Sequence, residues 1–246
     1  LPPKTARDLC FKSFIHLCPR IKRVRHDSCN NDQRRAVPVR QRTAGKQLDN
    51  KYIGSARVRY AIEHSMNVCA VRTLTETVGL EKGYKYLENF GFTTLVNNDP
   101  NYPGMSDIAQ ATALGGITRG VYNIEMTAAY AAIANSGIYT EPLLYTEILD
   151  HDGNVLIDNS KPITRRVLKE STAFLLTSAM QDVINRGTGT PARLNNMPAA
   201  GKTGTTENST DLWLSAYTPY YTCSVWTGYD EDKTSWNNFG ISHGTK

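Results

Sequence analysis

The stretch AGKTGTT, at residues 200–206, precedes two segments rich in apolar, aromatic and β-branched residues, at residues 212–217 and 223–229. Turn-forming residues separate the segments, and this pattern predicts three consecutive strands. Helical periodicity comes earlier, at residues 58–64, 68–78, 81–89, 123–136 and 171–186. Asp152-Gly153-Asn154 stands between apolar segments at residues 143–149 and 155–157, which predicts a β-hairpin. Helices before a terminal antiparallel sheet predict an α+β fold.

The first predicted strand carries residue types suited to binding an anion. Gly204 adds no side chain, and a glycine inside a strand often marks a place where a ligand comes close. Lys202 adds a positive charge, and Thr203 and Thr205 add hydroxyl donors. Together they favour an extended ligand that ends in a carboxylate. The alternative is an ordinary strand with a bulge glycine, because Lys-Thr-Gly alone is a weak motif.

A second polar group, Ser65-Met66-Asn67, lies between the first two predicted helices. Taken alone, Ser65 could be a helix cap and Asn67 an Asx-turn residue. His64 precedes the serine, but neighbours in sequence on a helix do not face each other, which favours a structural role for this histidine. Five cysteines without a C-x-x-C spacing indicate neither a disulfide framework nor a redox motif. We expect no metal and no cofactor.

Longer stretches around these groups resemble the transpeptidase domain of class A, bifunctional penicillin-binding proteins, in which a Ser-x-Asn type triplet precedes Lys-Thr-Gly. The resemblance covers about residues 50–246. It is carried by AIEHSMNVCAV at 61–71, ALGGITRGV at 113–121, AAYAAIANSG at 128–137, RGTGT at 186–190 and AGKTGTTENSTDLWLSAYTP at 200–219. It implies the β-lactamase/transpeptidase-like fold of the penicilloyl serine transferases, an antiparallel sheet flanked by helices, here incomplete.

The resemblance also implies a role for each polar residue in serine acyl transfer between cell-wall stem peptides. Ser65 would be the serine that passes a proton toward the leaving amine, and Asn67 would hydrogen-bond the lysine of Ser-x-x-Lys and the substrate amide. Lys202 would keep the field positive and orient Ser65. Thr203 and Thr205 would hold the terminal carboxylate of a stem peptide or a β-lactam, and the N–H of Thr205 would form half of the oxyanion hole.

The nucleophile of this reaction is unknown, because no Ser-x-x-Lys occurs in the 246 residues. The resemblance implies that this motif belongs within residues 1–48, where its nearest relic is Leu9-Cys10-Phe11-Lys12, with leucine in the place of the serine. The chain is therefore expected to descend from a D,D-transpeptidase but to be inactive as written. We also expect it to be a fragment of a membrane-anchored parent with a glycosyltransferase domain, located on the extracytoplasmic face of a bacterial membrane, because neither a membrane span nor a signal peptide is recognisable.

Charge divides the chain into two parts. The formal net charge is +5, but residues 1–50 carry twelve Lys or Arg against four acidic residues, which leaves the remainder slightly acidic. The expected domain boundary lies between a basic segment at residues 1–48 and a transpeptidase domain at residues 49–246. Residues 1–48 show no clear hydrophobic period, which indicates a disordered segment. Because the Ser-x-x-Lys motif that the resemblance implies here is missing, a second hypothesis is that the segment is translated from a shifted reading frame, which sequencing the coding DNA tests.

Three alternatives remain open. A serine β-lactamase would share the fold but would need a deacylating base such as a glutamate. A non-catalytic module that binds cell-wall peptides or a protein partner agrees with the missing Ser-x-x-Lys. A zinc or nucleic-acid module in the basic segment is disfavoured, because its cysteine and histidine spacing matches no common zinc pattern and aromatic side chains for base stacking are scarce. No nucleic-acid partner is expected.

Overall fold

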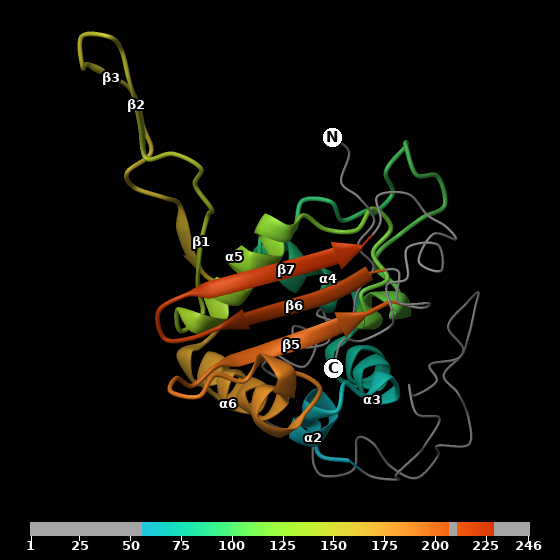
Figure 1. Ribbon diagram of the computed structural model, residues 1–246. Coiled ribbons are helices and arrows are strands. Elements are labelled where there is room, and N and C mark those ends of the chain that lie inside the picture. The colour runs from blue at the N-terminus through green and yellow to red at the C-terminus, as the bar shows by residue number, and fades with distance from the viewer. Residues whose placement is uncertain (1–55, 207–210, 229–246) are drawn as a thin grey trace, which may run out of the picture.

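The computed structural model describes residues 56–206 and 211–228. Its main sheet has three antiparallel strands, β5 (Ala200–Thr205), β6 (Asp211–Tyr217) and β7 (Thr222–Gly228), in the order β5-β6-β7 (Figure 1). This confirms the three strands that the sequence predicts. Along β6 every second residue is buried, as expected of a strand with one face toward a core. Among the described strands, β5 pairs with β6 only, so it forms an edge of this sheet.

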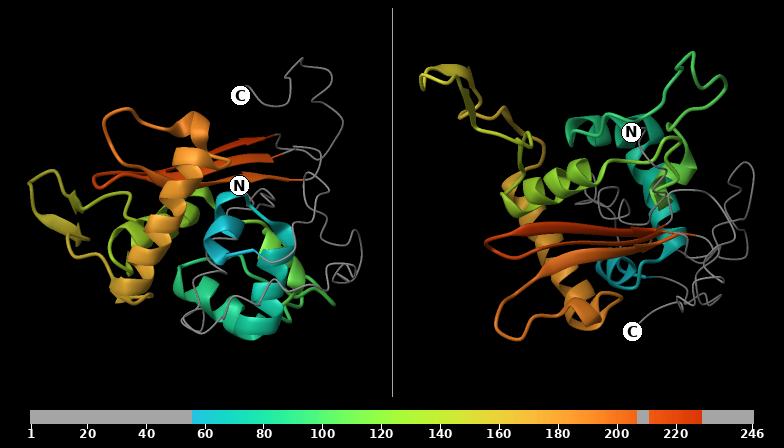
Figure 2. Two further views of the ribbon diagram at one scale, coloured as in Figure 1. Left: turned by 90° about the horizontal axis from the view of Figure 1, so that it is seen from below. Right: turned by 45° about the horizontal axis from the view of Figure 1, so that its top comes forward.

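Two long helices pack against the sheet. Helix α5 (Asn123–Ala134) contacts β6 and β7, and α6 (Glu170–Arg186) contacts β5. Figure 2 shows the helices gathered mainly on one side of the sheet. The small side chains of α5, including Ala129 and Ala132, are buried and let the helix approach closely, while Met180 and Trp213 fill the same core. The predicted α+β architecture is confirmed.

A group of shorter helices precedes α5. These are α2 (Val58–Glu63), α3 (Asn67–Arg72), the π-helical segment η3 (Thr73–Val78), α4 (Leu80–Asn89) and the 3₁₀ turn η4 (Gln110–Leu114). The single helix predicted for residues 68–78 is wrong in its second half, where the backbone widens. The hydroxyls of Thr73 and Thr75 donate to the carbonyls of Cys69 and Val71, and such bonds compete with regular helix geometry.

Two short antiparallel pairs lie outside the main sheet. Strand β1 (Ile138–Thr140) pairs with β4 (Thr164–Arg166), and β2 (Glu147–Leu149) pairs with β3 (Val155–Asp158). The β2–β3 hairpin confirms the turn predicted at Asp152-Gly153-Asn154. The β1–β4 pair was not predicted, because each strand has three residues and too little alternation to be recognised. A 3₁₀ turn, η5 (Thr190–Ala192), follows α6.

The helix ends differ slightly from those predicted. Helix α5 begins at Asn123 but its cap is Tyr122, whose N–H donates to Glu125. It ends at Ala134 rather than residue 136, because Ser136 and Gly137 both adopt positive φ. The basic segment at residues 1–48 and its Leu9-Cys10-Phe11-Lys12 stretch lie outside the described residues. In the described ranges, no helix is both long enough and apolar enough to cross a lipid bilayer.

Candidate functional site

Ser65 occupies a strained turn between two helices. Helix α2 ends at Glu63, and Ser65 then adopts a left-handed backbone conformation, with φ of 54°, before α3 begins at Asn67. Its N–H donates to the carbonyl of Ile62 at 3.2 Å. A left-handed conformation is uncommon for a residue with a side chain and is often found at functional sites. Ser65 is buried, and the residue that caps α3 is Met66, so Ser65 does not serve as that helix's cap.

Lys202 reaches Ser65 from the edge strand of the sheet. Its ammonium Nζ donates to Ser65 Oγ at 2.9 Å and to the carbonyl of Thr203 at 3.0 Å. The two side chains are 137 residues apart in the sequence, and the lysine is fully buried. Burying an ammonium group costs free energy unless oxygens replace its water. The fold therefore brings together the two motifs that the sequence analysis singled out.

The other predicted site residues lie on the same two segments. Asn67 is half-buried at the first position of α3, next to the serine turn. On β5, Gly204 is buried opposite Trp213, while Thr203 and Thr205 are half-buried. The two threonines are two residues apart on a strand, so their side chains leave the same face. A pair of hydroxyls in this arrangement could hold the two oxygens of a carboxylate.

The loop after α6 joins this site, which sequence reasoning missed. Thr188 Oγ1 lies 2.7 Å from Thr203 Oγ1, within hydrogen-bond distance, and the Thr188 N–H donates to the carbonyl of Glu63 at 3.3 Å. Gly187 lies so close that a Cβ there would stand 2.4 Å from the same carbonyl. The sequence signal for this loop is RGTGT at residues 186–190. It contributes to the family resemblance but does not indicate a contact with the serine turn.

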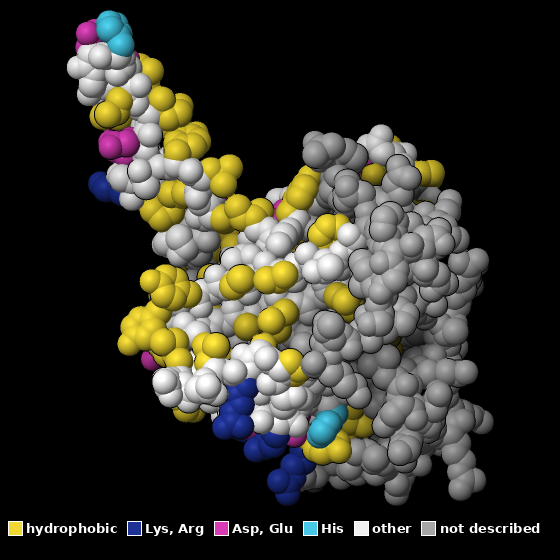
Figure 3. Space-filling view, viewed as in Figure 1, with side chains coloured by type: hydrophobic (Ala, Val, Ile, Leu, Met, Phe, Trp, Pro, Cys, Tyr) yellow, Lys and Arg dark blue, Asp and Glu magenta, His cyan; other side chains and the backbone are white. Residues whose placement is uncertain are grey.

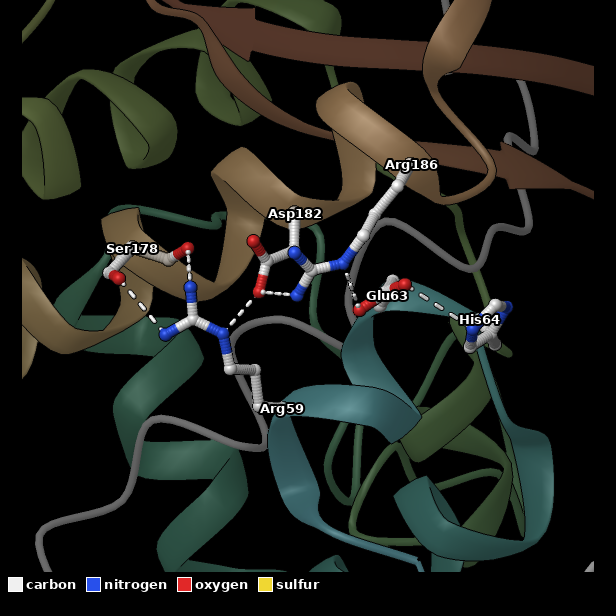
Figure 4. A network of polar contacts seen from close by, with 6 residues as sticks. All are labelled: Arg59, Glu63, His64, Ser178, Asp182 and Arg186. Atoms are coloured by element: carbon white, nitrogen blue, oxygen red, sulfur yellow. Dashed lines mark hydrogen bonds and ion pairs between the residues drawn. The ribbon is translucent and has the colours of Figure 1, made fainter.

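A charged network connects α2 to α6 next to the serine turn (Figure 4). The Arg59 guanidinium donates to the buried carboxylate of Asp182, and also to the hydroxyl and carbonyl of Ser178 at 3.0 and 2.8 Å. Arg186 lies 2.8 Å from the same carboxylate. The hydrogen bond from Arg59 lowers the pKa of Asp182 below its ordinary value, with further help from the charges of both arginines.

Glu63 extends this network to the end of α2. Its carboxylate is buried and lies 3.2 Å from Arg186 Nε and 3.4 Å from His64 Nε2. The His64 ring also packs beside the Tyr60 ring, with centroids 4.1 Å apart. These contacts agree with the structural role predicted for His64. Because Glu63 is the last residue of α2, the network fixes the chain just before Ser65 turns.

The geometry defines what these groups could do chemically. A serine hydroxyl that accepts a hydrogen bond from a buried ammonium can relay a proton, and the positive charge favours anionic ligands and transition states. In the part of the chain that the structure describes, no group of three or more His, Cys, Asp or Glu side chains is arranged to hold a metal ion. Acyl transfer would use these groups together with a nucleophile.

Comparison with known proteins shows the family to which the chain belongs. The family described as "Penicillin binding protein transpeptidase domain" matches residues 28–237. The chain therefore belongs to the family of penicillin-binding protein transpeptidase domains. The match begins upstream of residue 49, inside the segment that the sequence analysis set apart, so the domain boundary stays a prediction.

The relatives place the chain among class A penicillin-binding proteins. It is 39% identical over 184 residues to penicillin-binding protein 1A of Clostridium acetobutylicum, covering 74% of this chain and 22% of that protein. It is 34% identical over 208 residues to penicillin-binding protein 1F of Bacillus subtilis, covering 82% of this chain and 27% of that protein. The matched part is thus about a quarter of each relative's length.

Solved structures show the same fold. Penicillin-binding protein 1A from Haemophilus influenzae superposes with a TM-score of 0.74 at 22% identity, over 93% of this chain and 39% of that one. PonA1 from Mycobacterium tuberculosis, solved in complex with penicillin V, gives a TM-score of 0.73 at 21% identity, over 92% of this chain and 61% of that one. At these identities the likeness establishes the fold alone.

Proposed function

We propose that residues 56–206 and 211–228 carry the recognition half of a peptidoglycan D,D-transpeptidase site, meaning the groups that bind the substrate without the nucleophile that attacks it. This half would bind stem peptides ending in D-Ala-D-Ala and also β-lactams. The observation that carries the proposal is the 2.9 Å hydrogen bond from Lys202 Nζ to Ser65 Oγ, two buried groups from distant segments. A buried ammonium is costly, so its position on an edge strand favours a functional over a purely structural role.

The substrate peptide would lie extended along β5. Because β5 is an edge strand among the described strands, its outer N–H and C=O groups can pair with an added strand. Thr203 and Thr205 would bind the terminal carboxylate, and Gly204 would let the peptide approach the backbone. Asn67 would donate to the substrate amide, Ser65 would pass a proton toward the leaving amine, and Lys202 would orient Ser65.

We further propose that a polypeptide with this sequence does not form an acyl-enzyme. Serine acyl transfer needs the serine of Ser-x-x-Lys, and this motif is absent from the 246 residues. Losing the nucleophile of such a site costs on the order of a million-fold in rate. The same observation favours a second candidate, a non-catalytic module that binds cell-wall peptides or a protein partner through the remaining groups.

The wider setting is also a proposal. A class A parent would be anchored in the membrane, carry a glycosyltransferase domain and present this domain on the extracytoplasmic side, where peptidoglycan is cross-linked. Substrate cross-linking would then depend on the parent and not on this chain alone.

Binding of a synthetic stem peptide tests the recognition half without any need for turnover. A peptide ending in D-Ala-D-Ala with a free carboxylate should perturb the amide signals of β5, and its C-terminal amide should bind about tenfold more weakly, because a charged hydrogen bond is lost. Thr205→Val should weaken the free acid by a similar factor. Thr164→Val, an exposed threonine on β4, is the matched control and should change nothing.

Equal binding of the acid and the amide would overturn the carboxylate assignment. Equal binding by wild type and Thr205→Val would remove this residue from the site. If the peptide perturbed no signal of β5, the recognition proposal as a whole would fail.

A further inference from the structure

Residues 141–163 form an arm that projects from the body with its apolar side chains exposed. The arm leaves the body between β1 and β4 and carries the β2–β3 hairpin (Figure 1). Leu144 is 87% exposed and Leu156 is 65% exposed. Figure 3 shows apolar side chains along much of the arm. Ile148, Leu149, Val155 and Ile157 of the two strands are exposed as well. Soluble proteins rarely leave so many clustered apolar side chains in water without a partner.

The hairpin is a separate two-stranded sheet. Among the described strands, β2 and β3 pair only with each other, and every residue of both is exposed. A lone two-stranded hairpin is marginally stable in water and leaves an unpaired edge on each strand. Its turn is nonetheless well formed, because the Asp150 carboxylate accepts hydrogen bonds from the N–H groups of Asp152 and Asn154. The turn thus holds β2 and β3 together while the outer edge of each strand stays open to pairing with another strand.

The charge of the arm limits what can bind it. It carries Glu141, Glu147, Asp150, Asp152 and Asp158 against one lysine, Lys161. Glu147 lies directly opposite Asp158 across the two strands. Two like charges in such a pair destabilise a hairpin, and a cation between them would relieve the repulsion. The same negative charge disfavours anionic lipid surfaces and the phosphates of nucleic acids.

We propose that this arm is a docking site for a partner polypeptide that adds as a strand to the hairpin, with alternating apolar and basic side chains. The apolar residues of the partner would cover those of β2 and β3, and its Lys or Arg would lie near Glu147 and Asp158. The arm points away from α2 and α3 in both figures, so docking would leave the Ser65 site open (Figures 1 and 2).

Two short synthetic peptides test this proposal on the full chain, one alternating valine with lysine and one alternating valine with glutamate. The lysine peptide should shift the amide signals of β2 and β3, and its binding should weaken as salt is added. Glu147→Lys combined with Asp158→Lys should reduce its affinity on the order of tenfold. Glu81→Lys combined with Glu88→Lys makes the same charge change on exposed residues of α4 and should have no such effect.

A second pair of variants tests the apolar contribution. Ile148→Ser with Ile157→Ser should also weaken the lysine peptide about tenfold, whereas Met105→Ser with Ile124→Ser, two exposed apolar positions elsewhere, should not. Equal binding of the two peptides would overturn the proposal, as would shifts outside the arm only or no shifts at all. Hairpin shifts that depend on protein concentration alone would show that a second copy, and not a basic partner, covers the arm.

Discussion

Ser65 Oγ accepts a hydrogen bond from Lys202 Nζ at 2.9 Å, although 137 residues separate the two in the chain. Each placement costs free energy, because the serine has a left-handed backbone conformation and the lysine side chain is fully buried. Two contacts near Ser65 hold the end of α2 in place, namely the charged network with α6 and the docking of the loop at residue 187. Each contribution can be measured separately.

Replacing the buried lysine should not destabilise the fold. Lys202→Met keeps most of the volume and removes the free-energy cost of burying an ammonium group. We expect the free energy of unfolding in urea to stay level or rise, while binding of a carboxylate-ended peptide is lost. Lys82→Met, on the exposed face of α4, controls for the loss of one positive charge. A loss of more than about 2 kcal/mol in Lys202→Met would show that the lysine is structural.

The backbone of Ser65 makes glycine a better replacement than alanine. Both Ser65→Gly and Ser65→Ala remove the hydroxyl, but only alanine keeps the strain of a positive φ, which is worth about 1 kcal/mol. Ser65→Gly should therefore have the higher free energy of unfolding. At Ser171, inside α6, the order should reverse, because glycine weakens a helix. The same order at both positions would contradict the strain assigned to Ser65.

Asp182 should make stability depend on pH in the acid range. Its pKa is lowered in the folded state by the hydrogen bond from Arg59, so its contribution is fully present above the unfolded value of about 3.9 and is lost as pH falls through the lower folded value. Asp182→Asn should lower stability at neutral pH by about 1–3 kcal/mol and should flatten the acid limb. Urea unfolding from pH 6 to pH 2 checks this, with exposed Glu81→Gln as control. Parallel curves for Asp182→Asn and wild type would refute it.

Gly187 should be intolerant of a side chain. In Gly187→Ala the new Cβ would stand 2.4 Å from the carbonyl of Glu63, so the loop or the end of α2 must move. We expect a loss of about 1–3 kcal/mol and shifted amide signals at His64 and Ser65. Gly153→Ala, at the hairpin tip, has open space but a positive φ, and it should cost stability without shifting those signals. Unchanged signals in Gly187→Ala would mean that the loop does not position the serine turn.

Much of the fold could be predicted because its signals are local. The strands that carry Lys202 and Trp213 and the turn at Gly153 follow from residue types within a few positions. The same local patterns could not show that η3 widens after Arg72, or that β1 and β4 pair, because those outcomes depend on hydroxyl competition and on short, distant partners.

The candidate site could be predicted only in part, and through the family resemblance rather than through local sequence patterns. Ser65 and Lys202 were paired through the family resemblance, since no local pattern brings residues so far apart together. The contacts of Glu63 with Thr188 and Arg186 were missed, because they join an ordinary helix end to a loop and carry no motif. The exposure of the arm was missed as well, because its apolar strands have the same pattern as strands packed on a core.

The most direct test of the account is the intact mass of the full chain after incubation with a penicillin. The account predicts no adduct from the folded protein. The groups that would bind the penicillin are present, but the Ser-x-x-Lys nucleophile that would form the covalent bond is absent. Wild type and Lys202→Ala should then give the same unmodified mass. A covalent adduct on wild type that Lys202→Ala abolishes would contradict the account, because it would show a working nucleophile elsewhere in the chain, with Cys10 and Ser13 the first residues to map.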